Sequence, residues 1–227
     1  MDPLSMSDHR LLVIVISWNR CDFLRRTLNS LFERSDAGQT DVVVVDNGSD
    51  LPTRELIASE TRLAGYRQLE TNLGLNMAAE LALSEWLTPE HAWVLLSDAD
   101  MEYQVPVRLG TELLEQQPQI GAVSFQHSPE HPETGTLIYL DRNWPLKQTE
   151  RGCSLLMSAH TLLRMRPLPV QQLKDLDWWI CRDAPQSLQA HNQLIAVLPG
   201  GAKHLGWRRG DSTWQDIEIP EYAAYRT

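Results

Sequence analysis

Residues 11–20 read LLVIVISWNR, an unbroken apolar run that gives way to polar residues. Leu11–Ser17 is continuous and rich in β-branched side chains, which is typical of a strand buried on both faces of a sheet. Two further runs have the same form, residues 41–49 (DVVVVDNGS) and residues 92–100 (AWVLLSDAD). Polar side chains therefore follow directly after each of the three expected strands.

Segments with helical patterns separate these runs. Phe23–Glu33 places its apolar residues at helical spacing, and residues 51–59 and 75–87 are also expected to be helical, with a short strand at 66–69. This order predicts an α/β fold with a mainly parallel sheet and helices on both faces. Ligands of such sheets bind at the carboxyl ends of the strands, so we expect one crevice to receive the three polar groups.

The pattern is less regular after Glu102. We find no repeat, low-complexity tract or long Gly/Ser linker that would mark a flexible boundary. The expected elements are a helix over 105–117, strands near 122–126 and 136–140, a partly helical segment at 155–165 and a helix that starts within 176–181.

Composition narrows the class of protein. The chain has 227 residues, of which 42% are apolar and 22% charged, an ordinary globular profile. Its formal charge of −10 disfavours a broad phosphate-binding surface. Cys21, Cys153 and Cys181 lack CxxC spacing, so neither a zinc site nor a disulfide framework is expected. No apolar run reaches the ~18 residues of a transmembrane segment. The start MDPLSMSDHR does not resemble a secretory signal, so we expect a cytoplasmic location.

The segment Asp98-Ala99-Asp100 follows the third apolar run directly. Two carboxylates two positions apart at a strand end can hold a divalent cation and a ribose hydroxyl together. Mn²⁺ and Mg²⁺ prefer oxygen ligands, and phosphate oxygens commonly complete the shell. A DxD alone is a weak signal, because acidic pairs in loops are common and usually only solvated. Its meaning therefore depends on the rest of the chain.

Four segments occur in a distinctive order, namely residues 18–20 (WNR), 45–49 (VDNGS), 72–76 (NLGLN) and 96–100 (LSDAD). Together they resemble the family 2 glycosyltransferases, over about residues 11–102. The resemblance implies the GT-A fold, in which a nucleotide-binding half precedes an acceptor-binding half. It thus implies a single domain over the whole chain, with a nucleotide-sugar-binding half at 10–102 and an acceptor-binding and catalytic-base half at 103–227.

The resemblance also implies which residues bind the donor. Asp46 is expected to accept a hydrogen bond from the nucleobase. Ser17, Asn19 and Arg20 are expected to line the same pocket from the end of the first strand. Asn72 would approach the base or the ribose, although an Asn at this place is also a good N-cap for the helix that follows.

The remaining implied roles concern the metal and the ribose. Asp98 is expected to bind the ribose, whereas Asp100 would bind Mn²⁺ or Mg²⁺ and, through the metal, the diphosphate. Residues 201–206 (GAKHLG) resemble the late segment whose histidine completes metal binding in some members, which makes His204 a candidate ligand. The alternative for His204 is a histidine with no ligand role.

Residues 174–179 (KDLDWW) look like the family's acidic motif, in which an aspartate is the catalytic base. The glutamate that usually precedes the base is Lys174 here, so both Asp175 and Asp177 are candidates, and we prefer Asp175. Either carboxylate also suits the N-terminus of a helix, where it would satisfy free N–H groups.

The activity implied is a metal-dependent, inverting transfer of a hexosyl or pentosyl unit from a nucleotide sugar, by default a UDP-sugar. Asp175 would take the proton of the acceptor hydroxyl, and the metal on Asp100 would neutralise the leaving diphosphate. The acceptor is open: a saccharide, a lipid-linked sugar, a small metabolite, a protein or a modified nucleobase. The absence of a membrane segment slightly favours a soluble acceptor.

Three other functions compete with this one. A catalytically degenerate module that only binds a nucleotide is consistent with Lys174 and the short chain. A phosphatase of the haloacid dehalogenase type also uses DxD, but there the pair normally ends the first strand. A sugar-nucleotide pyrophosphorylase needs a Gly-rich N-terminal loop, which residues 17–20 do not supply.

Overall fold

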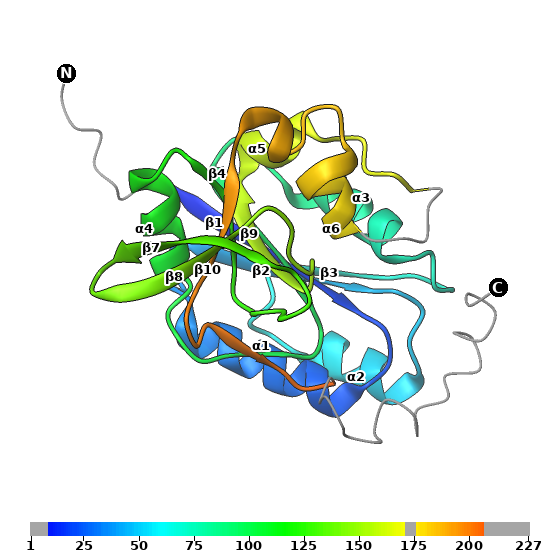
Figure 1. The fold of residues 1–227 in the computed structure, drawn as a ribbon. Coiled ribbons are helices and arrows are strands. Elements are labelled where there is room, and N and C mark those ends of the chain that lie inside the picture. Colours follow the sequence, from blue (N-terminus) through cyan, green and yellow to red (C-terminus); the bar gives the residue numbers. More distant parts are fainter. Residues whose placement is uncertain (1–8, 171–175, 207–227) are drawn as a thin grey trace.

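The computed structural model describes residues 9–170 and 176–206, which form a nine-stranded mixed sheet between two layers of helices (Figure 1). The strand order is β3-β2-β1-β4-β9-β6-β10-β8-β7. The strands are β1 (Arg10–Ser17), β2 (Thr40–Asp46), β3 (Gly65–Gln68), β4 (His91–Asp98), β6 (Ile120–Ser124), β7 (Glu133–Tyr139), β8 (Arg142–Lys147), β9 (Ser154–Ser158) and β10 (Leu194–Val197).

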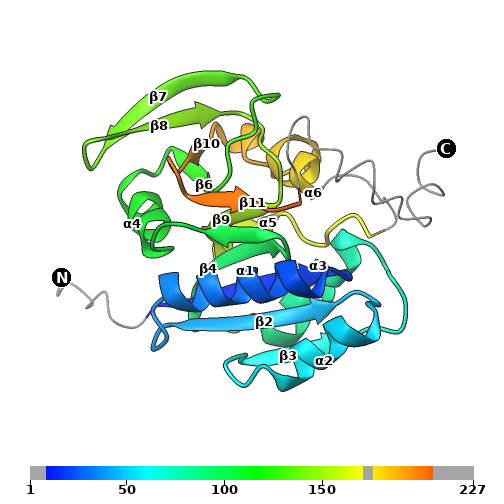
Figure 2. The ribbon, with the colours of Figure 1, turned by 90° about the horizontal axis from the view of Figure 1, so that it is seen from below.

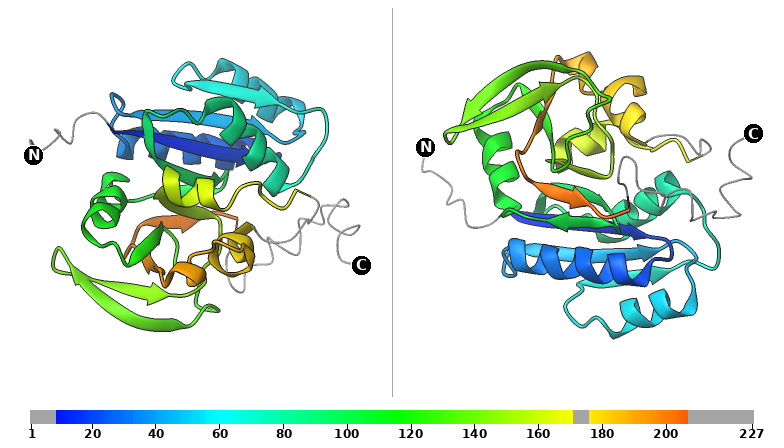
Figure 3. Two further views of the ribbon diagram at one scale, coloured as in Figure 1. Left: turned by 90° about the horizontal axis from the view of Figure 1, so that it is seen from above. Right: turned by 60° about the horizontal axis from the view of Figure 1, so that its bottom comes forward.

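Alternate residues of the central strands pack against the two helical layers, as the period of a strand requires. Leu12 and Ile14 of β1 pack in a cluster with residues of α3, α5 and α6, whereas Val13 and Val15 pack with residues of α1, α2 and α4. The two helical layers on opposite faces of the sheet are visible in Figures 1 and 3. Both faces of the sheet are therefore covered, which explains the unbroken apolar runs. The helices are α1 (Cys21–Arg34), α2 (Leu51–Ser59), α3 (Leu75–Trp86), α4 (Arg108–Gln116), α5 (Ala159–Arg164) and α6 (Leu176–Trp178), the last continued by a π-helical turn at Trp179–Asp183.

The pairing pattern fixes which strand ends meet. β1 is parallel to β2 and β4, and β10 is parallel to β6, whereas β9 is antiparallel to both β4 and β6. β4, β6 and β10 consequently run in the same direction as β1 and β2. Their carboxyl ends lie along one edge of the sheet, where ligands of α/β proteins bind.

The predicted α/β class is confirmed, and the elements of the first hundred residues agree with the sequence pattern to within a few residues. The second half differs more. The segment at 155–165 is helical in part, as expected, but its first residues belong to a strand that was not expected, because Ser154–Ser158 forms β9 between β4 and β6 before α5 begins. The apolar residues of strand and helix form one run, so only the pairing with two neighbouring strands separates them.

A second, two-stranded sheet lies beside the carboxyl edge. β5 (Met101–Tyr103) continues directly from the DxD segment and pairs antiparallel with β11 (Ala202–His204), as Figure 2 shows. This pairing sets His204 opposite Met101. It brings the late part of the chain to the end of β4.

Among the residues that the structure describes, no helix has the length and hydropathy to cross a bilayer.

Candidate functional site

The loops after β1 and β2 are tied together. Asn19 and Arg20 both adopt left-handed backbone conformations, with φ of 57° and 59°, which turn the chain sharply out of β1. The backbone N–H of Asn19 donates to Ser49 Oγ at 2.7 Å, and Asn19 Oδ1 accepts the N–H of Asp50 at 2.8 Å. The sharp turn thus places these polar groups against the end of the neighbouring strand.

Asp46 ends β2 and is fully buried. Its Oδ1 accepts the N–H of Ser49 at 2.9 Å, whereas its Oδ2 lies 3.4 Å from Arg54 Nε. Within the described part of the chain, that Oδ2 has no hydrogen-bond donor, and the buried hydroxyl of Ser17 also lacks a partner. Buried polar atoms are normally paired. Two unsatisfied groups at adjacent strand ends therefore mark a place where a ligand can bind. The sequence did not point to Arg54.

Asn72 organises the loop before α3. Its Oδ1 accepts the side-chain amide of Asn47 at 2.9 Å and the N–H of Gly74 at 2.8 Å. Gly74, not Asn72, is the N-cap of α3, so the capping alternative for Asn72 is wrong. Gly48 has a φ of 82°, and a Cβ there would lie 2.5 Å from the backbone of Thr71. Only glycine permits this close approach of the two loops.

The DxD segment is connected to β1 and α1. Asp98 is the last residue of β4, and Asp100 is buried. Arg20 Nη1 donates to Asp100 Oδ2 at 3.0 Å, and Thr27 Oγ1 donates to the carbonyl of Ala99 at 2.8 Å. The ends of β1, β2 and β4 therefore meet, and the structure brings their polar groups together as the sequence pattern indicated.

His204 reaches the same place from β11. Its Nε2 lies 3.5 Å from Asp100 Oδ1, and the N–H of Leu205 donates to the carbonyl of Asp100 at 2.7 Å. The buried Nδ1 of His204 has no hydrogen-bond partner among the described residues. A Cβ at Gly206 would collide with the Asp100 carboxylate and the Arg20 guanidinium. The chain after β11 is thus packed tightly over this ion pair.

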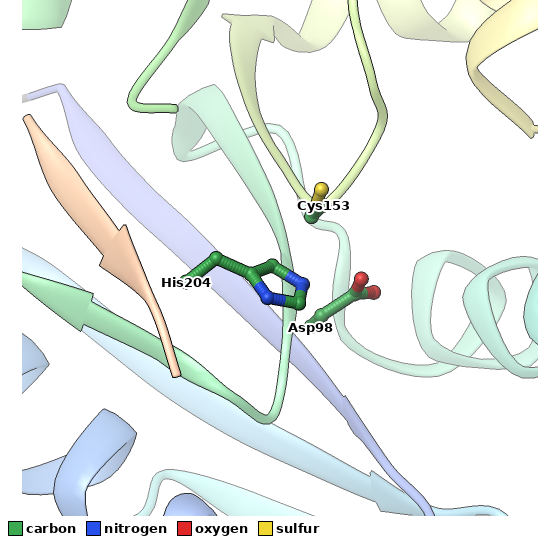
Figure 4. Close-up of side chains that lie close together, drawn as sticks. All are labelled: Asp98, Cys153 and His204. Atoms are coloured by element: carbon green, nitrogen blue, oxygen red, sulfur yellow. The ribbon is translucent and has the colours of Figure 1, made fainter. Parts of the chain in front are cut away.

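Cys153 is a neighbour that the sequence did not suggest. One ligand atom each of Asp98, Cys153 and His204 lies within 4.8 Å of the other two, and Figure 4 shows the three side chains grouped at the strand ends. The Asp98 N–H donates to the Cys153 carbonyl at 2.9 Å, and the thiol donates to Gln126 Oε1 at 2.8 Å. The one available signal was the pair Gly152-Cys153 just before the apolar run of β9.

The cluster carries an excess of negative charge. Burial raises the pKa of Asp98 well above its ordinary value, and the nearby carboxylates of Asp100 and Asp177 raise it further. Burial also raises the pKa of the Cys153 thiol. For His204, burial lowers the pKa, although Asp100 acts in the opposite direction. A neutral imidazole beside close carboxylates is a donor set that suits a divalent cation such as Mn²⁺ or Mg²⁺.

The two candidate bases have different outcomes. Asp175 lies outside the described residues. Asp177 belongs to α6, and its Cβ lies 3.2 Å from the position that a Cβ on Gly152 would take. Because the Asp177 carboxylate raises the pKa of Asp98, it is electrostatically part of the same cluster. The structure thus brings Asp177 to the site.

Comparison with known proteins agrees with this geometry. The family described as Glycosyl transferase family 2 matches residues 12–152, more than half of the chain. The chain belongs to this family. Among curated proteins, none matches the sequence. The family and the GT-A fold implied by the sequence resemblance are both confirmed.

Two solved structures illustrate the shared fold of this family 2 chain. A mannosyltransferase, PcManGT from Pyrobaculum calidifontis in complex with GDP-Man and Mn²⁺, has a TM-score of 0.62 at 18% identity, over 91% of this chain and 59% of that one. S. aureus TarS 1–349 in complex with UDP-GlcNAc has a TM-score of 0.61 at 18% identity, over 94% of this chain and 63% of that one. The chain therefore spans less than two thirds of either protein.

Proposed function

We propose that this family 2 chain is a metal-dependent, inverting glycosyltransferase. It moves a hexosyl or pentosyl unit from a nucleotide sugar, by default a UDP-sugar, to an acceptor hydroxyl. The observation that carries the proposal is the meeting of Asp46, Asp98, Asp100 and His204 at the carboxyl edge of one sheet. The complexes of PcManGT with GDP-Man and of TarS with UDP-GlcNAc support a nucleotide sugar as the donor.

The nucleoside binds at the ends of β1 and β2. The Oδ2 of Asp46, which lacks a hydrogen-bond donor among the described residues, accepts an N–H of the nucleobase. Ser17 is the register partner of Asp46 on β1, so its hydroxyl lies beside this carboxylate. Asn19 and Asn72 keep the two loops in place through the hydrogen bonds described above. Asp98 accepts the ribose hydroxyls. The contact to Asp46 supplies a donor to a buried oxygen that lacks one among the described residues, and the contact to Asp98 satisfies a buried carboxyl group that lies near like charges.

The diphosphate binds beside Asp100. Asp100 and His204, with Asp98 next to them, would hold Mn²⁺ or Mg²⁺, and the unpaired Nδ1 of His204 leaves a nitrogen available there. When bound, the ion neutralises negative charge that grows on the leaving diphosphate. The Arg20 guanidinium, 3.0 Å from Asp100, supplies a second positive charge at the same place.

The general base is Asp175, or Asp177 as the alternative. It takes the proton of the acceptor hydroxyl while the hydroxyl oxygen attacks the anomeric carbon. The new glycosidic bond forms on the face opposite the diphosphate, the bond to the diphosphate oxygen breaks, and the anomeric configuration is inverted. The contact of Asp177 with Gly152, next to Cys153, supports a base within reach of the cluster.

The test measures binding and hydrolysis of UDP-GlcNAc, UDP-glucose and GDP-mannose with and without Mn²⁺. We expect at least one donor to bind and to be hydrolysed slowly, and Asp100→Ala to abolish the metal-dependent part of its binding. Replacing the base by Asn is expected to lower turnover by ~10²–10⁴ while donor binding persists. If no donor binds in the presence of Mn²⁺, the proposal is wrong. Binding without hydrolysis would instead identify a degenerate nucleotide-binding module.

A further inference from the structure

A cavity of about 540 Å³ lies in the second half of the chain. It is bounded by the loop after β6, by one face of β8, by the loop after β10 and by β11, which are neighbouring elements in Figure 2. The residues that line it are Phe125, Gln126, His127, Asn143, Pro145 and Val197–His204. Its volume lies within the range of about 300–1,000 Å³ that is typical of sites for small molecules.

The cavity adjoins the candidate donor site. β6 and β10 run in the same direction as β1 and β4, so their carboxyl ends lie on the same edge of the sheet. One lining residue, His204, belongs to the candidate metal cluster, and a second, Gln126, contacts it. His204 Nε2 lies 3.5 Å from Asp100 Oδ1, and Gln126 Oε1 accepts the Cys153 thiol. A molecule held in the cavity would therefore lie next to the diphosphate end of a bound donor.

The lining combines apolar surfaces with a polar rim. Pro145, Leu198 and Pro199 contribute apolar surface without flexible polar groups. Gly201 allows the wall to close, because a Cβ at this position would lie 2.7 Å from the Phe125 carbonyl. Gln126 contributes a side-chain amide to the lining, and its oxygen accepts the Cys153 thiol at 2.8 Å. Apolar walls with few directed polar groups suit the faces and hydroxyls of a sugar ring.

The charge of the lining is opposite to that of the chain. The sequence has 30 acidic and 20 basic residues, yet the lining contains one lysine, two histidines and no carboxylate. Lys203 is exposed and forms no ion pair within the described segments. Its cross-strand neighbour Glu102 is paired with Arg26 at 2.8 Å, and His127 is paired with Glu133 at 3.0 Å. The ammonium group of Lys203 is thus left to meet a charge on a ligand.

We propose that this cavity is the acceptor subsite and that it takes a saccharide unit bearing an anionic group, a carboxylate or a phosphate. The inference rests on the proposed function and extends it to the acceptor. The sugar ring packs on Pro145 and Pro199, its hydroxyls reach Gln126, and its anionic group faces Lys203. The bounded volume and the polar rim fit a compact saccharide unit better than a lipid chain or a protein surface.

The experiment uses ligand-observed NMR titrations of the full chain with glucuronate, glucose 6-phosphate and glucose. We expect one or both anionic sugars to bind about fivefold more tightly than glucose, which corresponds to ~1 kcal/mol from one partly exposed charge pair. Tighter binding of glucuronate would indicate that the site takes a carboxylate, and tighter binding of glucose 6-phosphate would indicate a phosphate. Lys203→Gln is expected to remove the preference for the anionic sugars. Glucose binding that equals or exceeds theirs would overturn the anionic assignment.

A blocking variant tests the location. Asn143→Trp places an indole in the cavity from β8 and is expected to weaken binding of all three sugars at least tenfold. Arg142→Trp carries the same ring on the preceding residue, which does not line the cavity, and should leave sugar binding unchanged. If Asn143→Trp binds like the wild type, the cavity is not the subsite. If circular dichroism shows that Asn143→Trp is unfolded, the location is tested instead by Lys203→Gln at an exposed position. Unchanged preference of that variant for the anionic sugars would then place their binding outside the cavity.

Titration of the wild-type chain with UDP and Mn²⁺ separates this inference from the function on which it rests. UDP binding without sugar binding would overturn the acceptor subsite and leave the donor site intact. Failure of UDP to bind would count against the proposed function itself.

Discussion

A fully buried ion pair holds the loop between β8 and β9. Lys147 Nζ lies 2.7 Å from Glu150 Oε2, and neither side chain has any exposed surface. Lys147 also donates to the Ser128 carbonyl at 2.6 Å, while Glu150 accepts the N–H of Arg151 at 2.9 Å. Both charged groups therefore have hydrogen-bond partners beyond each other, Ser128 for the Lys147 ammonium and Arg151 for the Glu150 carboxylate.

Lys147→Met is expected to remove about 3–5 kcal/mol of unfolding free energy. The reason is that the substitution leaves the Glu150 carboxylate buried without a counter-charge. It also removes one of the two donors to the Ser128 carbonyl, which still accepts the N–H of His131. For a chain of this length, the midpoint of thermal unfolding should fall by roughly 6–20 °C. The double substitution Lys147→Met with Glu150→Leu should recover most of the loss, because no unpaired charge is then buried.

The loss is measured by urea unfolding, followed by tryptophan fluorescence, for the two single variants and the double variant. The matched control is Arg108→Met, which removes an exposed i,i+4 pair with Glu112 and should cost no more than about 0.5 kcal/mol. A loss below about 1 kcal/mol for Lys147→Met would refute the reasoning. So would a double variant as unstable as the single one, since the penalty would then not come from an isolated charge.

The same loop connects stability to activity. It leads into Gly152, which packs against Asp177, and into Cys153, whose carbonyl accepts the N–H of Asp98. Lys147→Met should therefore weaken Mn²⁺-dependent donor hydrolysis even at temperatures where the chain remains folded. The double variant, which restores packing, should recover part of that activity.

Three further predictions concern single carboxylates. Asp98→Asn should raise the unfolding temperature in metal-free buffer at about pH 8, because the raised pKa of Asp98 means that its ionised form is disfavoured in the fold. This gain in stability should shrink as pH falls through that pKa. Calorimetry should also show that Mn²⁺ no longer stabilises the variant. Asp46→Asn should lower the affinity for UDP, measured by titration calorimetry, about tenfold or more, because an amide cannot replace a charged acceptor. An unchanged affinity would exclude the contact between Asp46 and the nucleobase. The hydrogen bond from Arg10 lowers the pKa of Asp41 in the folded chain. Asp41 therefore stabilises the fold at pH values above its pKa in the unfolded chain, and this stabilisation is lost as pH falls through its pKa in the folded chain. Asp41→Asn should make the unfolding free energy, measured in urea, depend less on pH on the acid side.

The first half of the fold could be predicted because each strand and its site residues are contiguous in the sequence. Asp46 directly ends β2 and Asp98 directly ends β4, so a parallel sheet alone brings them to one edge. The apolar runs were unambiguous because both faces of these strands are covered. Local pattern and tertiary structure therefore gave the same answer for this half.

The second half could not be predicted in the same way. β9 inserts between β4 and β6 in the antiparallel direction, and no local pattern in Ser154–Ser158 specifies those partners. Cys153 and Gln126 reach the site only because of that insertion. The buried Lys147–Glu150 pair could not be predicted from the sequence either, since a short charged pattern usually indicates a solvated surface.

The arrangement of charges links the two halves of the site. Asp98 ends β4, Asp100 lies in the turn that follows it, and Asp177 belongs to α6. Arg20 donates to Asp100 at 3.0 Å, and His204 lies 3.5 Å from the same carboxylate. A fold that selected only for stability would gain by replacing one of these carboxylates with a neutral residue. The retained excess of negative charge is therefore best explained by a cation that binds with the ligand, and the stabilising effect expected of Asp98→Asn measures what the protein gives up to keep that site.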